Sequence, residues 1–289
     1  MNQDILTLIQ ENMSSFSKGQ KRIAGFILHS YDKAAFMTAS RLGQQVQVSE
    51  STVVRFAAEL GFGGYPNMQR ELQKMIRSRL TSVQRIEVAK DRMGDQDVLA
   101  SVLQSDMEKL RQTLEEVDRE SFEQATSALA GARKIYIVGV RSSQALAVFL
   151  HFYLSLIFDG AVLVSANSAS EVFERLFWVE PEDVVLGISF PRYSTRTVQA
   201  MSFARDRGAT TVAITDSEAS PLAAISHYTL TARSDMASFV DSLVGPLSLV
   251  NALLVEVSRK KDDNLAKTFQ SLEKIWEDYG VYQKVVEAP

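Results

Sequence analysis

The chain contains no cysteine, only three histidines and no long uninterrupted apolar run. Without cysteine there can be no disulfide bridge, thiol catalysis or cysteine-ligated metal site. No segment approaches the roughly 20 consecutive apolar residues that a membrane-spanning helix requires. The first residues, MNQDILTLIQENMSS, lack the basic-then-apolar pattern of a secretion signal. The sequence predicts a soluble, cytoplasmic protein with no membrane partner, and it shows no cluster of metal ligands.

Acidic residues slightly outnumber basic residues over the whole chain, whose net charge is -4, but the charge is unevenly distributed. Residues 1–80 contain ten Lys/Arg and six Asp/Glu, a balance of +4, whereas residues 81–289 contain 21 and 29, a balance of -8. A basic first quarter followed by an acidic remainder favours phosphate contacts at one end of the chain only.

With 289 residues and 46% hydrophobic content, the chain is long enough for about two domains. Short helical patterns precede residue 61. Strong stop signals then follow at Gly61, Gly63-Gly64 and Pro66. Residues 67–80 look helical and basic. Residues 81–96 are polar, as a linker would be. We predict an all-α N-terminal domain over residues 1–80, a linker over 81–96 and a second domain over 97–289.

The second domain alternates short apolar runs with helical patterns. Two amphipathic helices are expected at about 97–116 and 119–130, and an apolar and an amphipathic helix at about 238–259 and 264–283. Between them lie the runs KIYIVGV (134–140), AVLV (161–164), DVVLGISF (183–190), TTVAIT (210–215) and HYTLT (227–231). The first four are rich in β-branched residues and precede helical segments, which is typical of buried parallel strands. We predict an α/β doubly wound, five-stranded parallel sheet.

Residues 38–66, TASRLGQQVQVSESTVVRFAAELGFGGYP, have the pattern of a helix-turn-helix. Thr38 and Ser49 can cap the two helices, and QVQV (45–48) is short enough for the turn. The residues expected to hold the helices together are Leu42, Val48, Val53, Val54, Phe56 and Leu60. Two core helices joined by a turn would show the same spacing.

Ser49, Glu50, Ser51, Thr52 and Arg55 are then left near the outward-facing start of the second helix. Small hydroxyl groups there allow close approach to phosphates and base edges, and Arg55 can reach a phosphate or a guanine edge. With Thr38, these residues are the predicted DNA-binding set.

The segment QVSESTVVRFAAELGFGGY resembles the signature of the RpiR/MurR family of bacterial regulators. The matching residues are Val48, Ser49, Thr52, Val53, Arg55, Phe56, Leu60, Gly61, Phe62, Gly64 and Tyr65. Two residues depart from a generic helix-turn-helix. Gly43 replaces the usual Ala and should loosen the first helix, and Gln47 occupies a turn position that often holds Gly and therefore requires an unusual backbone angle. The resemblance implies an N-terminal DNA-binding domain and a C-terminal sugar isomerase (SIS) domain.

Two loops of the second domain suggest an effector site. In the common strand order 2-1-3-4-5, the loops VGVRSSQAL (138–146) and ISFPRYSTRT (188–197) flank the topological switch point, where such sheets bind ligands. Hydroxyl groups and an arginine just before a helix, Arg141 in the first loop and Arg192 in the second, favour a dianionic phosphate. Ordinary helix caps would look similar.

The family resemblance implies the individual effector residues. The first loop is similar to the family pattern G-x-[GR]-x-S, which points to Ser142 and Ser143. The second is similar to S-x-S-G-x-T, which points to Ser189, Ser194 and Thr197. This loop is longer than the plain pattern. Arg192 and Arg196 would support extra negative charge, and Tyr193 could stack on or bond to a sugar.

Catalytic residues are harder to find. Aldose–ketose isomerisation needs a tuned base, and the three histidines, His29, His151 and His227, are more often structural in such positions. Glu171 is the one candidate carboxylate, since in SIS domains this segment often borders the sugar, but a helix start also favours Glu. The chain lacks GxGxxG, so no dinucleotide cofactor is expected. We therefore predict no enzyme activity and no cofactor, with Glu171 in the effector set.

Together these observations predict a DNA-binding regulator of sugar-metabolism genes, controlled by a phosphorylated sugar. Its expected partners are a double-stranded operator and a second copy of the chain, as a homodimer or a dimer of dimers, because helix-turn-helix proteins usually read two half-sites. The apolar segment SFVDSLVGPLSLVNALLVEV (238–257) is either a self-association surface or a core helix. The alternatives are a sugar-phosphate isomerase with an accessory helical domain and a sensor that binds a protein partner.

Overall fold

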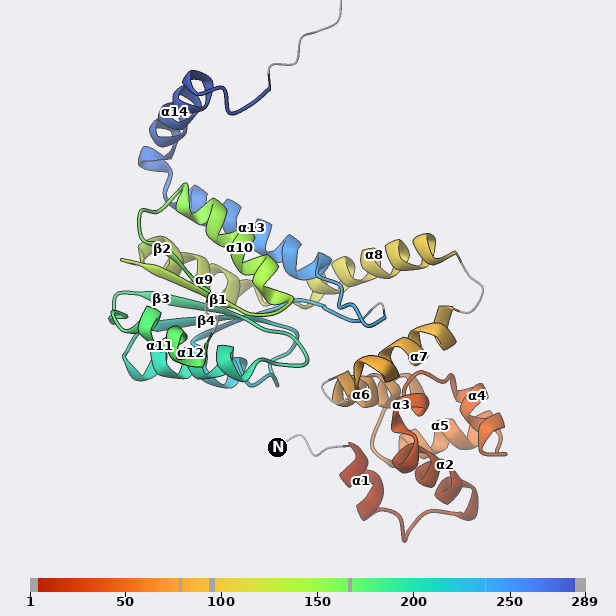
Figure 1. Cartoon of the computed structure of the whole chain (residues 1–289). Helices are drawn as coiled ribbons and strands as arrows, with labels where there is room; N and C mark the ends of the chain where they lie inside the picture. Colours follow the sequence, from red (N-terminus) through yellow and green to blue (C-terminus); the bar gives the residue numbers. More distant parts are fainter. Residues whose placement is uncertain (1–4, 78–79, 94–96, 166–167, 237, 284–289) are drawn as a thin grey trace, which may run out of the picture. The chain divides into compact units, whose positions relative to one another are not determined.

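A computed structural model describes residues 5–77, 80–93, 97–165, 168–236 and 238–283 (Figure 1). The chain forms two compact units. The first contains Met1–Leu103 together with Met236–Asp241, and the second contains Gln104–Asp235 and Ser242–Pro289. Each unit has its own hydrophobic core, so each is described by itself.

The first unit is all-helical. Its helices are α1 (Ile5–Glu11), α2 (Lys18–His29), α3 (Tyr31–Ala34), α4 (Ala39–Gln45), α5 (Glu50–Glu59), α6 (Tyr65–Arg77) and α7 (Ser82–Met93). Their apolar faces meet in one core, in which the rings of Phe16 and Phe56 lie 5.0 Å apart. The phenol of Tyr65 is buried there and donates to the carbonyl of Met37 at 2.8 Å. Burial raises the pKa of this phenol, so it stays protonated.

The stretch predicted as a linker, residues 81–96, is mostly helix α7, so that prediction is wrong for Ser82–Met93; residues 94–96 lie outside the described ranges. Thr81 and Gln84 form a capping box in which the Thr81 hydroxyl accepts from the Gln84 amide and the Gln84 side chain accepts from the Thr81 amide. Val88 and Ala89 are buried. The boundary between the units falls instead inside α8 (Val98–Glu116), between Leu103 and Gln104.

The helix-turn-helix consists of α4 and α5. Thr38 and Ser49 cap the two helices, as predicted from the sequence. Gln47 adopts the left-handed backbone expected of it, with φ of 56°. That Gly43 loosens α4 stays a prediction; the structure shows that its carbonyl accepts from the Val48 amide at 2.8 Å. A Cβ at Gly43 would lie 2.8 Å from the carbonyl oxygen of Val48, so the close approach of the two helices depends on this glycine.

The second unit is built on a five-stranded sheet in the order β2-β1-β3-β4-β5, with every neighbouring pair parallel, which confirms the predicted architecture. The strands are β1 (Ile135–Gly139), β2 (Ala161–Val164), β3 (Val184–Ile188), β4 (Thr210–Thr215) and β5 (Tyr228–Thr231). In the central pair, Gly139 lies opposite Ile188. The carboxyl ends of β1 and β3 therefore finish side by side.

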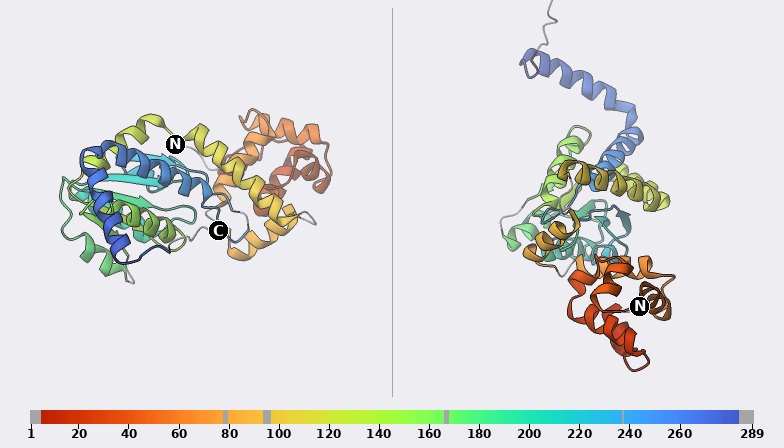
Figure 2. Two further views of the ribbon diagram at one scale, coloured as in Figure 1. Left: turned by 90° about the horizontal axis from the view of Figure 1, so that it is seen from above. Right: turned by 90° about the vertical axis from the view of Figure 1, so that its right-hand side faces the viewer.

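Helices cover both faces of the sheet, as the views in Figures 1 and 2 show. Because strand residues alternate between faces, Ile135 and Ile137 of β1 enter one core and Tyr136 and Val138 enter the other. The helices are α9 (Arg119–Gly131), α10 (Ser143–Ser155) and α13 (Val244–Lys260) on the first face, and α11 (Ala169–Leu176) and α12 (Thr195–Asp206) on the second. A short 3₁₀ turn, η1 (Ala223–Ile225), and the final helix α14 (Asp262–Asp278) complete the unit.

The apolar segment 238–257 is largely a core helix, the second of its two interpretations. Helix α13 begins at Val244, later than predicted, because residues 238–243 are not helical. One face of α13 is buried in the same core as α9 and α10. Val255, which is 66% exposed, is the exception among its large apolar side chains.

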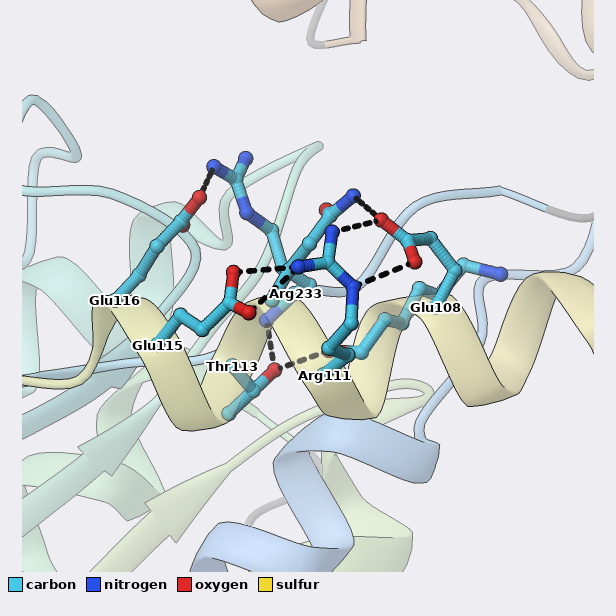
Figure 3. A network of polar contacts seen from close by, with 8 residues as sticks. Glu108, Arg111, Thr113, Glu115, Glu116 and Arg233 are labelled. Carbon is cyan, nitrogen blue, oxygen red and sulfur yellow. Dashed lines mark hydrogen bonds and ion pairs between the residues drawn. The ribbon is translucent and has the colours of Figure 1, made fainter.

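Within the second unit, α8 is joined to the chain after β5 through Thr113 (Figure 3). The Thr113 hydroxyl accepts from the Arg233 amide at 3.0 Å and donates to the Lys109 carbonyl at 2.8 Å. The Arg233 guanidinium donates to Glu116 on the same helix. Burial lowers the pKa of Arg233. The hydrogen bond to Glu116 and the nearby carboxylates together raise this pKa by more than burial lowers it, so the net shift is upward. This arginine therefore remains charged.

Exchanging Gly43 for alanine tests the close approach of α4 and α5. We expect Gly43→Ala to lower the free energy of unfolding of the helical unit by about 1–3 kcal/mol, since the added methyl group overlaps the Val48 carbonyl. The matched control is Gly25→Ala on α2, where a Cβ meets nothing within 4 Å. That variant should gain up to about 1 kcal/mol from helix propensity. Urea unfolding of the full chain, followed by circular dichroism, measures both; equal effects would contradict the prediction.

The joint at Thr113 is tested by Thr113→Val. This variant keeps the shape of the side chain but leaves the Arg233 amide without its acceptor, so we expect a loss of about 1–3 kcal/mol in the stability of the second unit. Thr113→Ser retains the hydroxyl and should recover most of the loss. If Thr113→Ser recovers the stability that Thr113→Val loses, the loss comes from the hydrogen bond and not from packing. Urea unfolding of the two variants measures both stabilities.

Candidate functional site

The first turn of α5 carries a network of hydroxyl groups. The Ser49 hydroxyl lies 2.9 Å from that of Ser51 and 2.8 Å from that of Thr52, and it also accepts from the Thr52 amide at 3.3 Å. Glu50, Ser51 and Arg55 are exposed beside it. The Arg55 Nε donates to the Ser51 carbonyl at 3.3 Å, so the arginine lies back along its own helix. The structure thus gathers the predicted residues of this helix on one surface.

Two details of this surface differ from or extend the sequence prediction. Val54, expected to pack between the helices, is 41% exposed, because it is one residue, or about 100°, further round α5 than the buried Val53. It joins the outward face and offers a methyl-sized apolar contact of the kind that a thymine methyl makes in the major groove. Thr38 is exposed at the start of α4, where its hydroxyl accepts from the Arg41 amide at 3.2 Å.

In the second unit, the loop after β1 turns sharply into α10. Arg141 has φ of 57°, in the left-handed region, and the next two residues begin the helix. A Cβ at Gly139 would lie 2.8 Å from the carbonyl of Ser143, so this glycine allows the helix start to approach the strand end. Ser143 is buried, whereas Ser142 is exposed and its hydroxyl makes no capping hydrogen bond in the described structure. An ordinary helix cap does not explain Ser142.

The loop after β3 is held by its own serines. The buried Ser189 hydroxyl accepts from the Ser194 amide at 3.0 Å, and the Ser194 hydroxyl caps α12 by accepting from the Thr197 amide at 3.4 Å. Ser194 therefore acts as a cap as well as a candidate ligand contact. Thr197 is 0% exposed, and its hydroxyl finds no hydrogen-bond partner among the described residues. Such an orphan is unusual in a folded protein and is often found where a ligand or ion completes the site.

A neighbouring strand contributes a residue that the sequence analysis missed. The Tyr193 hydroxyl donates to the Asp216 carboxylate at 2.8 Å, and Asp216 directly follows β4. Since β4 pairs with β3, its carboxyl end lies beside the second loop. Knowledge of the strand order alone would have been enough to nominate Asp216. Arg192 is exposed on the same loop.

Glu171 lies in the first turn of α11. The Ser168 hydroxyl caps that helix by accepting from the Glu171 amide at 3.2 Å, and the Glu171 carboxylate lies 3.5 Å from Arg175. Both features suit a helix start that favours negative charge. His227, another residue considered for catalysis, accepts from the Thr211 amide at 3.0 Å through Nδ1, which is a structural contact.

No group of three or more His, Asp or Glu side chains is placed to hold a metal ion in the part of the chain that the structure describes. Across the same residues, none of the helices combines the length and the apolar character needed to cross a bilayer.

Comparison with known families and proteins agrees with the two-unit organisation. The pattern of the rpiR-family helix-turn-helix domain matches residues 3–79, and that of the SIS domain matches residues 128–256. An uncharacterised HTH-type transcriptional regulator of Haemophilus influenzae is 27% identical over 276 residues, which cover 92% of this chain and 94% of the relative.

Two solved structures are similar. The sugar isomerase domain of an RpiR transcription factor from Sphaerobacter thermophilus has a TM-score of 0.59 and 30% identity, covering 62% of this chain and 99% of that one. The NanR protein of Vibrio vulnificus, solved in complex with ManNAc-6P, has a TM-score of 0.59 and 23% identity, covering 95% of this chain and 98% of its own. The second likeness concerns the fold alone.

The regulator relatives support the prediction that the chain is not an enzyme. With both domain patterns matched in the order that the sequence predicted, the chain belongs to the RpiR family of transcriptional regulators, with an N-terminal helix-turn-helix domain and a C-terminal SIS domain.

Proposed function

We propose that this regulator controls sugar-metabolism genes and that its SIS unit binds a phosphorylated sugar. The observation that carries the proposal is the orphan hydroxyl of Thr197, which is buried beside the end of β3. Ser142, whose hydroxyl makes no capping hydrogen bond in the described structure, follows the end of the neighbouring strand β1. Among the described residues, one buried hydroxyl without a hydrogen bond and one exposed hydroxyl that does not cap its helix thus follow two neighbouring strands. They flank the switch point, where this class of sheet binds ligands.

The charge of the two loops favours a phosphate. Residues 139–143 and 188–197 contain no Asp or Glu, and they carry Arg141, Arg192 and Arg196. Each loop runs into a helix start, where backbone amides favour anions. Ser143, Ser189 and Ser194 add hydroxyl groups beside those amides. A dianionic phosphate satisfies these donors better than a neutral ligand does.

The sugar would lie toward the polar groups that border the loops. The bonded pair of Tyr193 and Asp216 offers a phenol and a carboxylate at the end of β4. Glu171 is proposed to contribute a third polar group from α11. Carboxylates accept hydrogen bonds from sugar hydroxyl groups, so these residues suit a polyhydroxylated ligand. The fold relative NanR is complexed with ManNAc-6P, which makes that compound a sensible first probe.

The helical unit is proposed to read an operator. Ser49, Glu50, Ser51, Thr52 and Arg55 present hydroxyl, carboxylate and guanidinium groups at the start of α5, and Thr38 at the start of α4 would contact the DNA backbone. Helix-turn-helix proteins usually bind two half-sites about one helical turn apart, so we propose a homodimer or a dimer of dimers. Effector binding changes DNA affinity if the ligand favours one arrangement of the two DNA-reading heads.

Thr197→Val tests the effector site. Because the hydroxyl that it removes has no protein partner, we expect the ligand-free protein to melt at the same or a higher temperature than the wild type. ManNAc-6P and a panel of hexose phosphates should raise the melting temperature of the wild type. Losing a bond to a charged ligand should weaken binding about tenfold or more in the variant.

Ser142→Ala should weaken binding in the same assay, and Ser155→Ala, at the opposite end of α10, is the control. The wild-type shift should decline below about pH 6, as the phosphate gains its second proton. The site would be refuted if the ligand raised the melting temperatures of both Thr197→Val and Ser142→Ala as much as it raises that of the wild type. Turnover of a sugar phosphate that is abolished by Glu171→Gln would instead favour an isomerase.

Arg55→Ala tests the proposed DNA-binding surface of the helical unit. We expect operator affinity to fall by about tenfold or more, the usual cost of one lost arginine contact. Lys33→Ala, an exposed residue of α3 that is absent from the proposed surface, should leave affinity nearly unchanged. Fluorescence anisotropy with duplexes that the wild type selects from a random-sequence library provides the measurement. Failure of the wild type to select any duplex would favour a protein partner for this domain.

A further inference from the structure

An open hollow lies where α2 and α5 begin, beside the DNA-reading face. Its lining includes the guanidinium groups of Arg22 and Arg55 and the hydroxyl groups of Ser17, Ser49 and Thr52. This chemistry is that of an anion site, because guanidinium forks and hydroxyl groups donate to phosphate oxygens. The DNA-binding surface predicted from the sequence includes residues of α5. It does not include Arg22 of α2 or Ser17, which caps that helix.

The two arginines keep donors for a ligand. Arg22 donates one Nη2 hydrogen bond, to the Gln47 carbonyl at 2.9 Å, and Arg55 uses its Nε on the Ser51 carbonyl at 3.3 Å. Each guanidinium has five N–H donors, so most remain. Across the ranges that the structure describes, neither arginine takes part in an ion pair.

The one acidic residue in the lining is held by its own partner. Glu59 accepts from the side-chain amide of Gln20, whose oxygen in turn accepts from the Ser17 amide at 2.9 Å. Gly19 has no side chain to fill the space, and a Cβ there would lie 3.5 Å from Val48 and 3.6 Å from Thr52. These are ordinary contact distances, so a Cβ fits at this position, which is part of the lining.

We propose that this hollow binds one backbone phosphate of the DNA duplex, on the edge of the groove that α5 enters. The inference rests on the proposed DNA-binding function. Phosphates line both edges of the major groove, which is about 12 Å wide, so residues next to the inserted start of a helix meet the backbone. Arg22 then has two roles, since it holds the turn at Gln47 and contacts the phosphate. Arg55 is assigned to the phosphate rather than to a guanine edge.

A charge placed in the hollow gives the sharpest test. Gly19→Glu puts a carboxylate beside the proposed phosphate, and Gly19→Gln adds a neutral side chain of the same size. Because Gly19 lies in the first turn of α2, where acidic residues stabilise a helix, Gly19→Glu should fold at least as well as Gly19→Gln. We expect Gly19→Glu to bind library-selected duplexes about tenfold or more weakly than Gly19→Gln, with a salt dependence shallower by roughly one phosphate contact.

The phosphate itself can be located by neutral methylphosphonate linkages, introduced one at a time along a selected duplex. In the wild type, one linkage per half-site should cost about tenfold in affinity, the value of a charged hydrogen bond. In Arg22→Gln, that same linkage should cost clearly less than in the wild type, because Arg22 supplies part of the interaction that the linkage removes and Arg55 supplies another part. Lys33→Gln, which alters an exposed charge elsewhere on the unit, should retain the full sensitivity of the wild type.

The outcomes separate the two proposals. The phosphate site would be overturned, while DNA binding stands, if Gly19→Glu and Gly19→Gln bound DNA with equal affinity. It would also be overturned if every linkage lowered the DNA affinity of Arg22→Gln by the same factor as that of the wild type. A wild-type protein that selects no duplex would overturn the proposed function itself. Should Arg22→Gln prove unstable through loss of its bond to Gln47, the Gly19 pair still decides the question, because neither variant touches that bond.

Discussion

In the second unit, β1 lies between β2 and β3, and its pairing with β3 places Gly139 opposite Ile188. This register brings together two loops that are about 50 residues apart in the chain. At the other end of the pair, Arg133 binds both oxygens of the buried Asp183, just before β3, at 2.9 and 2.7 Å. The proposed effector site exists only because these two strands are neighbours.

The helical unit depends on close backbone contacts instead. The turn between α4 and α5 requires a left-handed residue at Gln47 and a residue without a side chain at Gly43. Arg22 of α2 holds the same turn through the Gln47 carbonyl. The helix that is proposed to read DNA is thus positioned by a neighbouring helix that also borders the proposed phosphate site.

Much of the fold was predictable, because local chemistry specifies it. Apolar runs, four of them rich in β-branched residues, marked the strands described here, and Thr38 and Ser49 marked the caps of α4 and α5. Helix α7 was missed, because its polar composition concealed a capping box and two buried apolar residues. Val54 was wrongly assigned to the core, because it is apolar like its buried neighbour Val53. Its position around the helix axis places it on the exposed face instead.

Local patterns were enough to predict a helical part and an α/β part, the strands, the caps of α4 and α5 and the loop residues that suit a phosphate, since propensity and capping act over a few residues. Which of those residues lack partners depends on how the chain packs. Among the described residues, packing leaves the Thr197 hydroxyl without a hydrogen bond, pairs Tyr193 with Asp216 and brings Arg22 beside α5. These outcomes depend on contacts between distant parts of the chain, which no local pattern records.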